Sequence, residues 1–474
     1  MKEAGMDLTS GNISKNMMKL ALPIMLSNFL QMFYNLTDAF WLGKLGENAR
    51  GAVSAAGIAF PIIFFLSSFG FGFVVAGTAL IAQYRGAGKF EMMRKVVGQF
   101  AFILVIFCAL FISGSFIFLD KILALLQVPA EIFIVTTQYI SVILVGVVFM
   151  FTFISYQSFA QGLGDTVSPM KIQIISVFIN LMLDPILIFG LWFFPRLEAV
   201  GAAYATLIAR VIAAIMAIIY LKKKSPILVP RLKDMIPDKV MLKKILKISI
   251  PASLGQSITS FGFLLLQGFV NSFGTVVITV FSIGNRLTSF FMMPAMGISN
   301  ALATVVGQNL GAGKVTRAVK SVKKAFILIM SIMLVGCTIL FFFGSFLTRF
   351  FINDPEVINI GLRMFRVTSL ASFIFGIVFI FMGVFNGSGH TKPTMLLNIV
   401  RLWGLRIPFV LMLSGLALKY VKIDFLNSFL QFMAKPLAEY PYDALWWSMV
   451  ISNTIIAIWA FLIYRKGRWK VGSI

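Results

Sequence analysis

The chain has 474 residues, 59% of them hydrophobic and only 12% charged, and its mean hydropathy is +0.94. A soluble domain carries about 25% charged and about 45–50% apolar residues, so this composition excludes an ordinary soluble protein and indicates a polytopic membrane protein. The formal net charge of +24, from 41 Lys and Arg against 17 Asp and Glu, would suit a nucleic-acid-binding protein. The positions of the charges argue against that function.

Apolar stretches follow one another along almost the whole chain. A membrane-spanning helix needs about 20 mainly apolar residues, and by that rule we expect about twelve spans. Their centres fall near residues 28, 66, 106, 145, 180, 210, 257, 292, 330, 372, 405 and 454. The runs are too long for β-barrel strands, and the alternation that such strands require is absent. The expected fold class is an all-α polytopic membrane protein, with residues 424–440 as a short interfacial segment.

Basic residues cluster in every second connection between the expected spans. The clusters occupy residues 85–95, 222–247, 314–324 and 465–470. Short cytoplasmic loops of membrane proteins are enriched in Lys and Arg, so the pattern predicts that both termini and the middle linker are cytoplasmic. The positive charge is then a topology signal, with contact to anionic lipid headgroups as a by-product, and we expect no nucleic-acid partner.

Two further features fit a membrane protein. Cys108 and Cys337 both fall within apolar spans, so the sequence predicts neither a disulfide framework nor a zinc site. The first apolar run extends past Asp38 without a small-residue cleavage pattern, so we expect a retained span rather than a signal peptide.

The sequence repeats itself at a spacing of about 225 residues, a symmetry common in transporter folds. Leu22-Pro23-Ile24 corresponds to Ile250-Pro251-Ala252, Gly86-Ala87-Gly88-Lys89 to Gly311-Ala312-Gly313-Lys314, and residues 161–166 to residues 386–391. We therefore expect two six-helix bundles, residues 1–221 and 241–474, joined by a basic linker of residues 222–240. An even number of spans gives both bundles the same orientation, so a pseudo-twofold axis along the membrane normal should relate them, with a cavity between them.

Only Asp38 and Asp184, of the seventeen acidic residues, lie well inside long apolar stretches. A carboxylate inside a bilayer is costly unless it finds a partner, so such an acid indicates a functional site. Tyr34 precedes Asp38 by four residues and Asn180 precedes Asp184 by four, which places each pair on one helix face. Pro185 removes one backbone donor and can kink its helix, which would open space beside Asp184.

The pattern favours a site for H⁺ or Na⁺. Two carboxylates in one pocket repel each other when both are charged, so a proton or a cation between them is expected. Asp38, Asp184, the Asn180 amide oxygen and the Thr206 hydroxyl also offer enough oxygens for Na⁺. The second half has neutral residues in the corresponding places, which favours a specialised role. The alternative is a protonated acid that only holds helices together.

These motifs resemble the multidrug and toxic compound extrusion (MATE) transporters, most closely their DinF-like branch, over essentially the whole chain. The residues that carry the resemblance are Pro23, residues 34–38, Gly86-Ala87-Gly88-Lys89, residues 161–165, residues 180–185 and Gly201-Ala202-Ala203-Tyr204-Ala205-Thr206. The resemblance implies a secondary active exporter that exchanges drugs or other amphipathic solutes for H⁺ or Na⁺ by alternating access. It assigns the coupling cation to the first half.

The resemblance also assigns roles to single residues. It makes Asp38 and Asp184 the coupling acids. Their polar partners would be Tyr34, Asn180 and Thr206, with Tyr139 nearby. It further implies that the first helix bends at Pro23 when the site changes state.

Three arginines complicate this assignment. Arg210 lies four residues after Thr206 and thus on the same face. It would oppose a bound cation if it reached Asp184, and it could equally line a cavity for anionic solutes or pair elsewhere. Arg401 and Arg406 lie in the corresponding region of the second half, where a long side chain can reach the membrane surface.

Met292, Met293 and Met296 are candidates for lining a promiscuous substrate cavity together with Phe290 and Phe291, because methionine surfaces re-pack around varied ligands. The alternative for each is contact with lipid or with the protein core.

Other functions fit the sequence less well. No phosphate-binding loop of the Gly-x-x-x-x-Gly-Lys-[Ser/Thr] type occurs, which argues against ATP-driven transport by this chain. No nucleophile–base or metal-ligand cluster indicates an enzyme, and no cofactor is expected beyond the coupling ion. A passive channel would not need two buried acids in one half only. The remaining alternative is a flippase or exporter of lipid-linked sugars, which would use the three arginines to hold a pyrophosphate.

The sequence therefore predicts a multidrug efflux antiporter for organic cations and amphipathic drugs. We expect a monomer in the inner membrane of a prokaryotic cell, with the bilayer as its surroundings.

Overall fold

The computed structural model describes residues 5–46, 49–125, 128–419 and 424–474, and these contain helices and connections but no strand. The helices are α1 (Ile13–Gly43), α2 (Ala49–Gly86), α3 (Phe90–Leu125), α4 (Ala130–Gly162), α5 (Val167–Phe189), α6 (Glu198–Lys224), α7 (Lys239–Asn271), α8 (Thr275–Gly311), α9 (Val315–Phe351), α10 (Pro355–Gly387), α11 (Thr391–Ile399), α12 (Ile407–Leu413), α13 (Asp424–Ala434) and α14 (Ala444–Arg465). A π-helical segment, η4 (Val400–Arg406), joins α11 to α12. The side chains of Asn35 and Leu36 lie outside the described part of the chain. The predicted all-α fold class is confirmed.

Eleven helices of the described residues are long and apolar enough to cross a membrane. They coincide with every predicted span except the first, which was centred near residue 28 and lies in α1. This helix is 31 residues long but carries Lys15, Lys19 and Asp38. With α1 the chain has about twelve long helices, as predicted. The segment predicted to lie at the interface forms the short helix α13 and not a further span.

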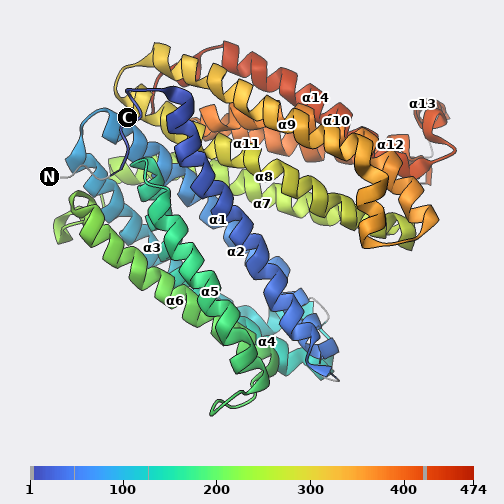
Figure 1. Cartoon of the computed structure of the whole chain (residues 1–474), viewed down its shortest axis with the longest axis horizontal. Coiled ribbons are helices and arrows are strands. Elements are labelled where there is room, and N and C mark those ends of the chain that lie inside the picture. The colour runs from blue at the N-terminus through green and yellow to red at the C-terminus, as the bar shows by residue number, and fades with distance from the viewer. Residues whose placement is uncertain (1–4, 47–48, 126–127, 420–423) are drawn as a thin grey trace.

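The helices form two bundles, α1–α6 and α7–α14 (Figure 1). The bundles meet at the end where both chain termini lie, and they diverge toward the opposite end. Helix α1 crosses between them. Met17, Leu20 and Ile24 of its first half are buried among residues of α8, α9 and α10, whereas its second half lies along α5.

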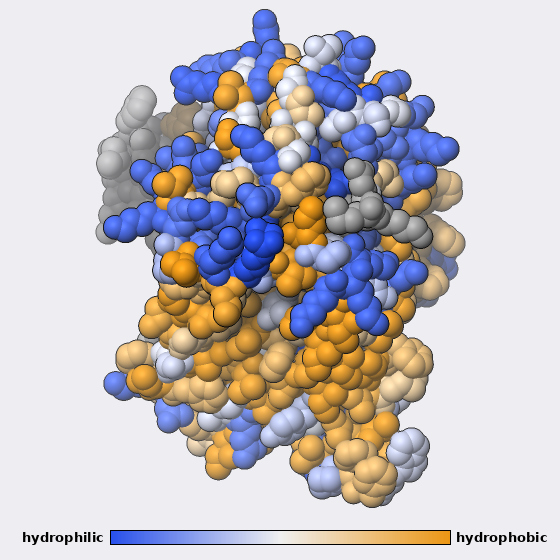
Figure 2. All heavy atoms as spheres, turned by 90° about the vertical axis from the view of Figure 1, so that its left-hand side faces the viewer, coloured by the Kyte–Doolittle hydropathy of each residue, from blue (hydrophilic) through white to orange (hydrophobic). Residues whose placement is uncertain are grey.

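The end of the molecule that carries the termini, the linker and the turns at residues 86–89 and 311–314 is called the terminal face. Figure 2 looks onto it and shows hydrophilic side chains gathered there, with a largely hydrophobic surface below. A polar cap over an apolar body is what a bundle needs if its body lies in hydrocarbon.

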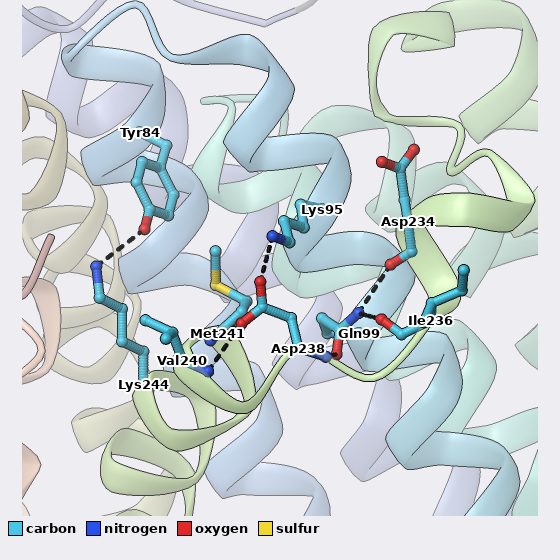
Figure 3. Close-up of polar contacts among 9 residues, drawn as sticks. All are labelled: Tyr84, Lys95, Gln99, Asp234, Ile236, Asp238, Val240, Met241 and Lys244. Atoms are coloured by element: carbon cyan, nitrogen blue, oxygen red, sulfur yellow. Dashed lines mark hydrogen bonds and ion pairs between the residues drawn. The ribbon is translucent and has the colours of Figure 1, made fainter.

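The linker between the bundles is fastened to α3 (Figure 3). The buried Gln99 donates through Nε2 to the carbonyl oxygens of Asp234 and Ile236, at 2.9 and 2.6 Å, and its Oε1 accepts from the Asp238 N–H at 2.9 Å. Arg94 donates to the Asp234 carboxylate at 2.8 Å. Asp238 also accepts from the first backbone N–H groups of α7, so the side chain of Gln99 fixes where the second bundle begins.

Two glutamines join the bundles at the terminal face in the same way. Gln83 of α2 donates to the carbonyl oxygen of Gly387 in the second bundle, and Gln308 of α8 donates to that of Gly162 in the first, both at 3.0 Å. The Oε1 atom of Gln308 accepts from the Leu8 N–H at 3.0 Å, and that of Gln83 accepts from the Ser473 N–H at 2.8 Å. We call Gln83 and Gln308 the glutamine pair. It ties each bundle to the other and to one end of the chain.

Glycine makes this contact possible. A Cβ atom on Gly86 would lie 1.9 Å from the carbonyl oxygen of Gln308, and one on Gly311 would lie 1.9 Å from that of Gln83. The two repeated Gly-Ala-Gly-Lys segments therefore let α2 and α8 cross closely at the terminal face. Their function here is packing and not phosphate binding.

Gln83→Leu and Gln308→Leu should favour separation of the bundles at the terminal face. Each substitution leaves a carbonyl and an N–H without their partner, at a cost of about 1–3 kcal/mol per buried group, so the equilibrium should shift toward the separated state by roughly thirtyfold or more where both groups are buried. Distances between spin labels at the exposed Lys89 and Lys320, in a background without the two native cysteines, should gain a longer population.

Gln267→Leu is the matched control, because among the described residues this side chain bonds Asn271 of its own helix, at 2.9 Å, and none of the other bundle. Unchanged distances in both glutamine-pair variants would show that the pair does not hold the bundles together.

Candidate functional site

Asp184 is fully buried in α5, and Asn180 lies one turn before it with 1% of its surface exposed. The Asn180 amide donates through Nδ2 to Asp184 Oδ1 at 3.2 Å. The spacing of four residues thus places both side chains on one face of the helix, as expected. Helix α5 continues through Pro185 and ends at a left-handed Gly190.

Helix α1 brings the second acid to the same place. Asp38 lies beside Asp184 and Asn180 and interacts with both. One turn earlier, the Tyr34 hydroxyl donates to Thr206 Oγ1 of α6 at 2.7 Å. Three helices of the first bundle therefore meet at the two acids.

Tyr139 of α4 closes the site from another side. It is 6% exposed and lies near enough to Asp38 and Asp184 to interact electrostatically with both. All six residues that were expected to handle the cation are therefore brought together, from α1, α4, α5 and α6.

Three oxygens of this cluster are buried without a hydrogen-bond donor: Asp38 Oδ1, Asn180 Oδ1 and Asp184 Oδ2. We call these three residues the acidic site. A buried acceptor without a partner is costly, and a buried carboxylate more so. Oxygen atoms of carboxylates and amides are also the ligands that hard cations prefer. The donor set fits a small cation such as Na⁺ or a proton.

Arg210 of α6 is half-buried and lies on the Asp38 side of the cluster. Its guanidinium acts electrostatically on Asp38, Tyr34 and Tyr139, and its side chain passes Gly146 of α4, where an added Cβ would lie 3.4 Å from Nη1. Within the part of the chain that the structure describes, Arg210 forms no ion pair. Its electrostatic effect falls on Asp38, whereas Asp184 was the acid considered from the sequence.

Comparison with known proteins identifies the fold family. The model of one family, MatE, matches the chain over residues 23–186 and again over residues 251–412, which is well over half of its length. The chain belongs to the MatE family. The two matches fall one in each bundle, as the internal repeat predicts. The chain is accordingly a multi-pass membrane transporter, and the resemblance to MATE transporters is confirmed.

The relatives of this MatE transporter are multidrug proteins by name. It is 28% identical to the "Probable multidrug resistance protein YpnP" of Bacillus subtilis over 468 residues, which cover 98% of this chain and 97% of the relative. It is 27% identical to the multidrug export protein MepA of Staphylococcus haemolyticus, over 96% of this chain and 94% of MepA.

Solved structures agree in fold. A MATE crystal structure in the bent conformation has a TM-score of 0.85 at 23% identity, covering 97% of this chain and 96% of that one. An outward-facing multidrug resistance MATE transporter has a TM-score of 0.84 at 22% identity, covering 98% of both chains.

The other residues singled out in the sequence lie apart from the acidic site. Pro23 is buried in α1 where this helix packs on the second bundle, and its carbonyl oxygen accepts from the Ser27 hydroxyl at 2.9 Å. His390 lies in the turn before α11 with Nδ1 3.2 Å from Ser388 Oγ, and burial lowers the pKa of this imidazole. Cys108 and Cys337 are free and buried.

An apolar cavity of about 670 Å³ lies between α1, α8 and α9. Met293, Phe290 and Phe291 line it, together with residues of α1 such as Phe29. Met292 instead packs against the buried core of the second bundle, and Met296 is 41% exposed; neither lines this cavity. Met293 thus lines an apolar cavity as expected, whereas Met292 and Met296 do not line this one.

Sequence reasoning missed the glutamine pair, although a signal was present. Gln83 stands three residues before Gly86, and Gln308 stands three residues before Gly311, so the glutamines repeat with the glycines.

Thr206→Val should destabilise the transporter by about 1–3 kcal/mol, because it leaves the buried Tyr34 hydroxyl without its acceptor. Thr136→Val is the matched control: Thr136 is fully buried and its hydroxyl has no partner, so its loss should cost little or nothing. Thermal unfolding of the purified variants in detergent measures the difference. Equal melting temperatures would show that the Tyr34–Thr206 bond contributes nothing to stability.

Proposed function

We propose that this chain is a secondary active multidrug exporter that moves amphipathic or cationic organic compounds out of the cell in exchange for H⁺ or Na⁺. The coupling cation would bind at the acidic site in the first bundle. The names of the relatives support export of drugs, and the donor set of the site supports cation coupling.

The observation that carries this proposal is the set of three buried oxygens without a donor. Two carboxylates and an amide carbonyl lie together between membrane-spanning helices, where each charge is costly unless it is compensated. A bound proton or Na⁺ supplies the missing positive charge. Its release on the other side of the membrane leaves the buried carboxylates uncompensated again, which is unfavourable. A purely structural acid would have its donors within the protein.

The charges around the site favour a single monovalent cation. Two carboxylates carry two negative charges, and the guanidinium of Arg210 near Asp38 offsets one of them. One proton or one Na⁺ then leaves the cluster neutral, whereas a divalent ion would leave it positive.

Helix α1 can couple the occupancy of the acidic site to the second bundle, because it contacts both. Asp38 and Tyr34 lie in its second half, while Met17, Leu20 and Ile24 of its first half pack against α8–α10. Pro23 lies between Leu20 and Ile24, within the part of α1 that packs on the second bundle, and a proline inside a helix weakens it locally because one backbone hydrogen bond is missing. Binding or release of the cation would then change how α1 supports the closed terminal face.

Asp184→Asn should abolish gradient-driven export of a fluorescent cationic dye from vesicles that contain the purified transporter. The amide keeps the size of the side chain but cannot exchange a proton or neutralise a cation. Imposing a Na⁺ gradient and a proton gradient in separate experiments identifies the coupling ion, since only one should drive the wild type at full rate.

Asp120→Asn, an exposed acid at the end of α3, should leave export unchanged and serves as the control. Undiminished export by the Asp184 variant would overturn the coupling assignment. A wild type that moves no dye under either gradient would overturn the drug substrate and favour the lipid-linked sugar.

A further inference from the structure

Two arginines are buried in the second bundle at membrane depth. Arg401 and Arg406, which we call the arginine pair, are 6% and 4% exposed and lie inside the candidate span Thr391–Leu413. The expectation that such long side chains reach the membrane surface does not apply to them, because almost none of either residue is accessible. A charged side chain in this position indicates a functional site whose partner has to be named.

The helix that carries the arginine pair is distorted so that the two side chains come together. Residues five apart in an α-helix point about 140° away from each other. Residues 400–406 instead form a π-helix, whose hydrogen bonds join residues five apart and thus bring Arg401 and Arg406 toward one face. The two guanidinium groups lie close enough to repel each other. Short π-helical segments occur frequently at functional sites.

The partners that the protein supplies to this pair are all neutral. Arg406 donates to Asn453 Oδ1 at 3.0 Å and to Ser452 Oγ at 3.4 Å, both on α14. Asn453 is itself fixed, because its amide donates to the carbonyl oxygen of Ala371 at 2.9 Å. Arg401 lies over the ring of Phe375 at 4.3 Å, and its Nε is buried without a hydrogen-bond partner.

Among the described side chains of the second bundle, no carboxylate forms an ion pair with Arg401 or Arg406. From residue 239 to the end of the chain the acidic residues are Asp354, Glu356, Asp424, Glu439 and Asp443. All of them lie outside the span that carries the arginine pair. Asp443, the buried one at the start of α14, is already bound by Arg363. Within the part of the chain that the structure describes, the arginine pair thus forms no ion pair with a carboxylate, and two like charges lying together inside the membrane are strongly unfavourable.

We propose that the second bundle binds a small monovalent anion, a halide ion or a carboxylate group, between Arg401 and Arg406. The N–H groups of the two guanidiniums would donate to it, with Asn453 and Ser452 holding Arg406 in place. Guanidinium groups bind carboxylates with paired hydrogen bonds, and the unpartnered Nε of Arg401 is a donor without an acceptor until an anion arrives. The anion is either a free ion from solution or the acidic group of a solute in transit.

This site is distinct from the acidic site and does not rest on the proposed export of drugs. It lies in the other bundle, in the span that corresponds by the internal repeat to α5. The two bundles would thus hold opposite charges in related positions, a cation in the first and an anion in the second.

The test is thermal unfolding of the purified full-length transporter in detergent at constant Na⁺ and constant ionic strength. Chloride or acetate replaces a bulky buffer anion in steps. A ligand that binds only the folded state raises the melting temperature in a saturable way. We expect a rise of a few degrees in the wild type and none in Arg401→Gln or Arg406→Gln.

Arg366→Gln, an exposed arginine on the neighbouring α10, is the matched control and should keep the full anion dependence. If chloride stabilises the wild type, the ligand is a free ion. If only acetate and acidic aromatic solutes do so, the ligand is the acidic group of a solute. A wild type that responds to neither anion, or arginine-pair variants that respond as the control does, would overturn the proposal. Should the variants fail to fold, the titration of the wild type decides alone.

Discussion

The lipid hydrocarbon around the spans offers no hydrogen-bond partner. A polar group buried there can therefore be satisfied only by another group of the protein or by a bound ligand. The glutamine pair meets this requirement within the protein: each of its two side chains donates to a carbonyl of the opposite bundle and accepts from a chain end. At the acidic site the protein leaves three oxygens without a donor. Groups that the protein satisfies by its own hydrogen bonds hold it together, and we expect a ligand where several carboxylate and amide oxygens without a donor converge, as they do at the acidic site.

The same constraint relates the two ends of the molecule. At the terminal face the bundles are joined by satisfied bonds and close glycine contacts, so separation there exposes several buried groups at once. In the mechanism that we propose, a cation binds and leaves at the acidic site, and its charge compensates the two carboxylates while it is bound. Helix α1 touches both regions, since Asp38 lies in its second half and Leu20 in its first. An exporter needs such an element, because the ion site and the closed face lie in different parts of the fold.

Contacts within one helix could be predicted from residue spacing, whereas contacts between helices could be expected only from the resemblance to a known family. Asn180 and Asp184 share a face because an α-helix repeats every 3.6 residues, and this holds whatever surrounds it. The pairing of Tyr34 with Thr206 depends on how α1 and α6 pack, which no spacing encodes. Arg401 and Arg406 were expected to reach the membrane surface, because a sequence shows neither the π-helix that the chain forms there nor the burial of both side chains. Met296 was assigned to the cavity because of its residue type alone, and the residue type does not show which way a side chain points.

The central claim, that the acidic site holds one monovalent cation, is tested most directly by counting the cations that the purified protein binds. Proton uptake is measured in an unbuffered titration and Na⁺ binding by calorimetry. Together they should show that the wild type binds one cation more than the Asp184→Asn variant. A wild type and an Asp184→Asn variant with the same proton and Na⁺ binding would contradict the account.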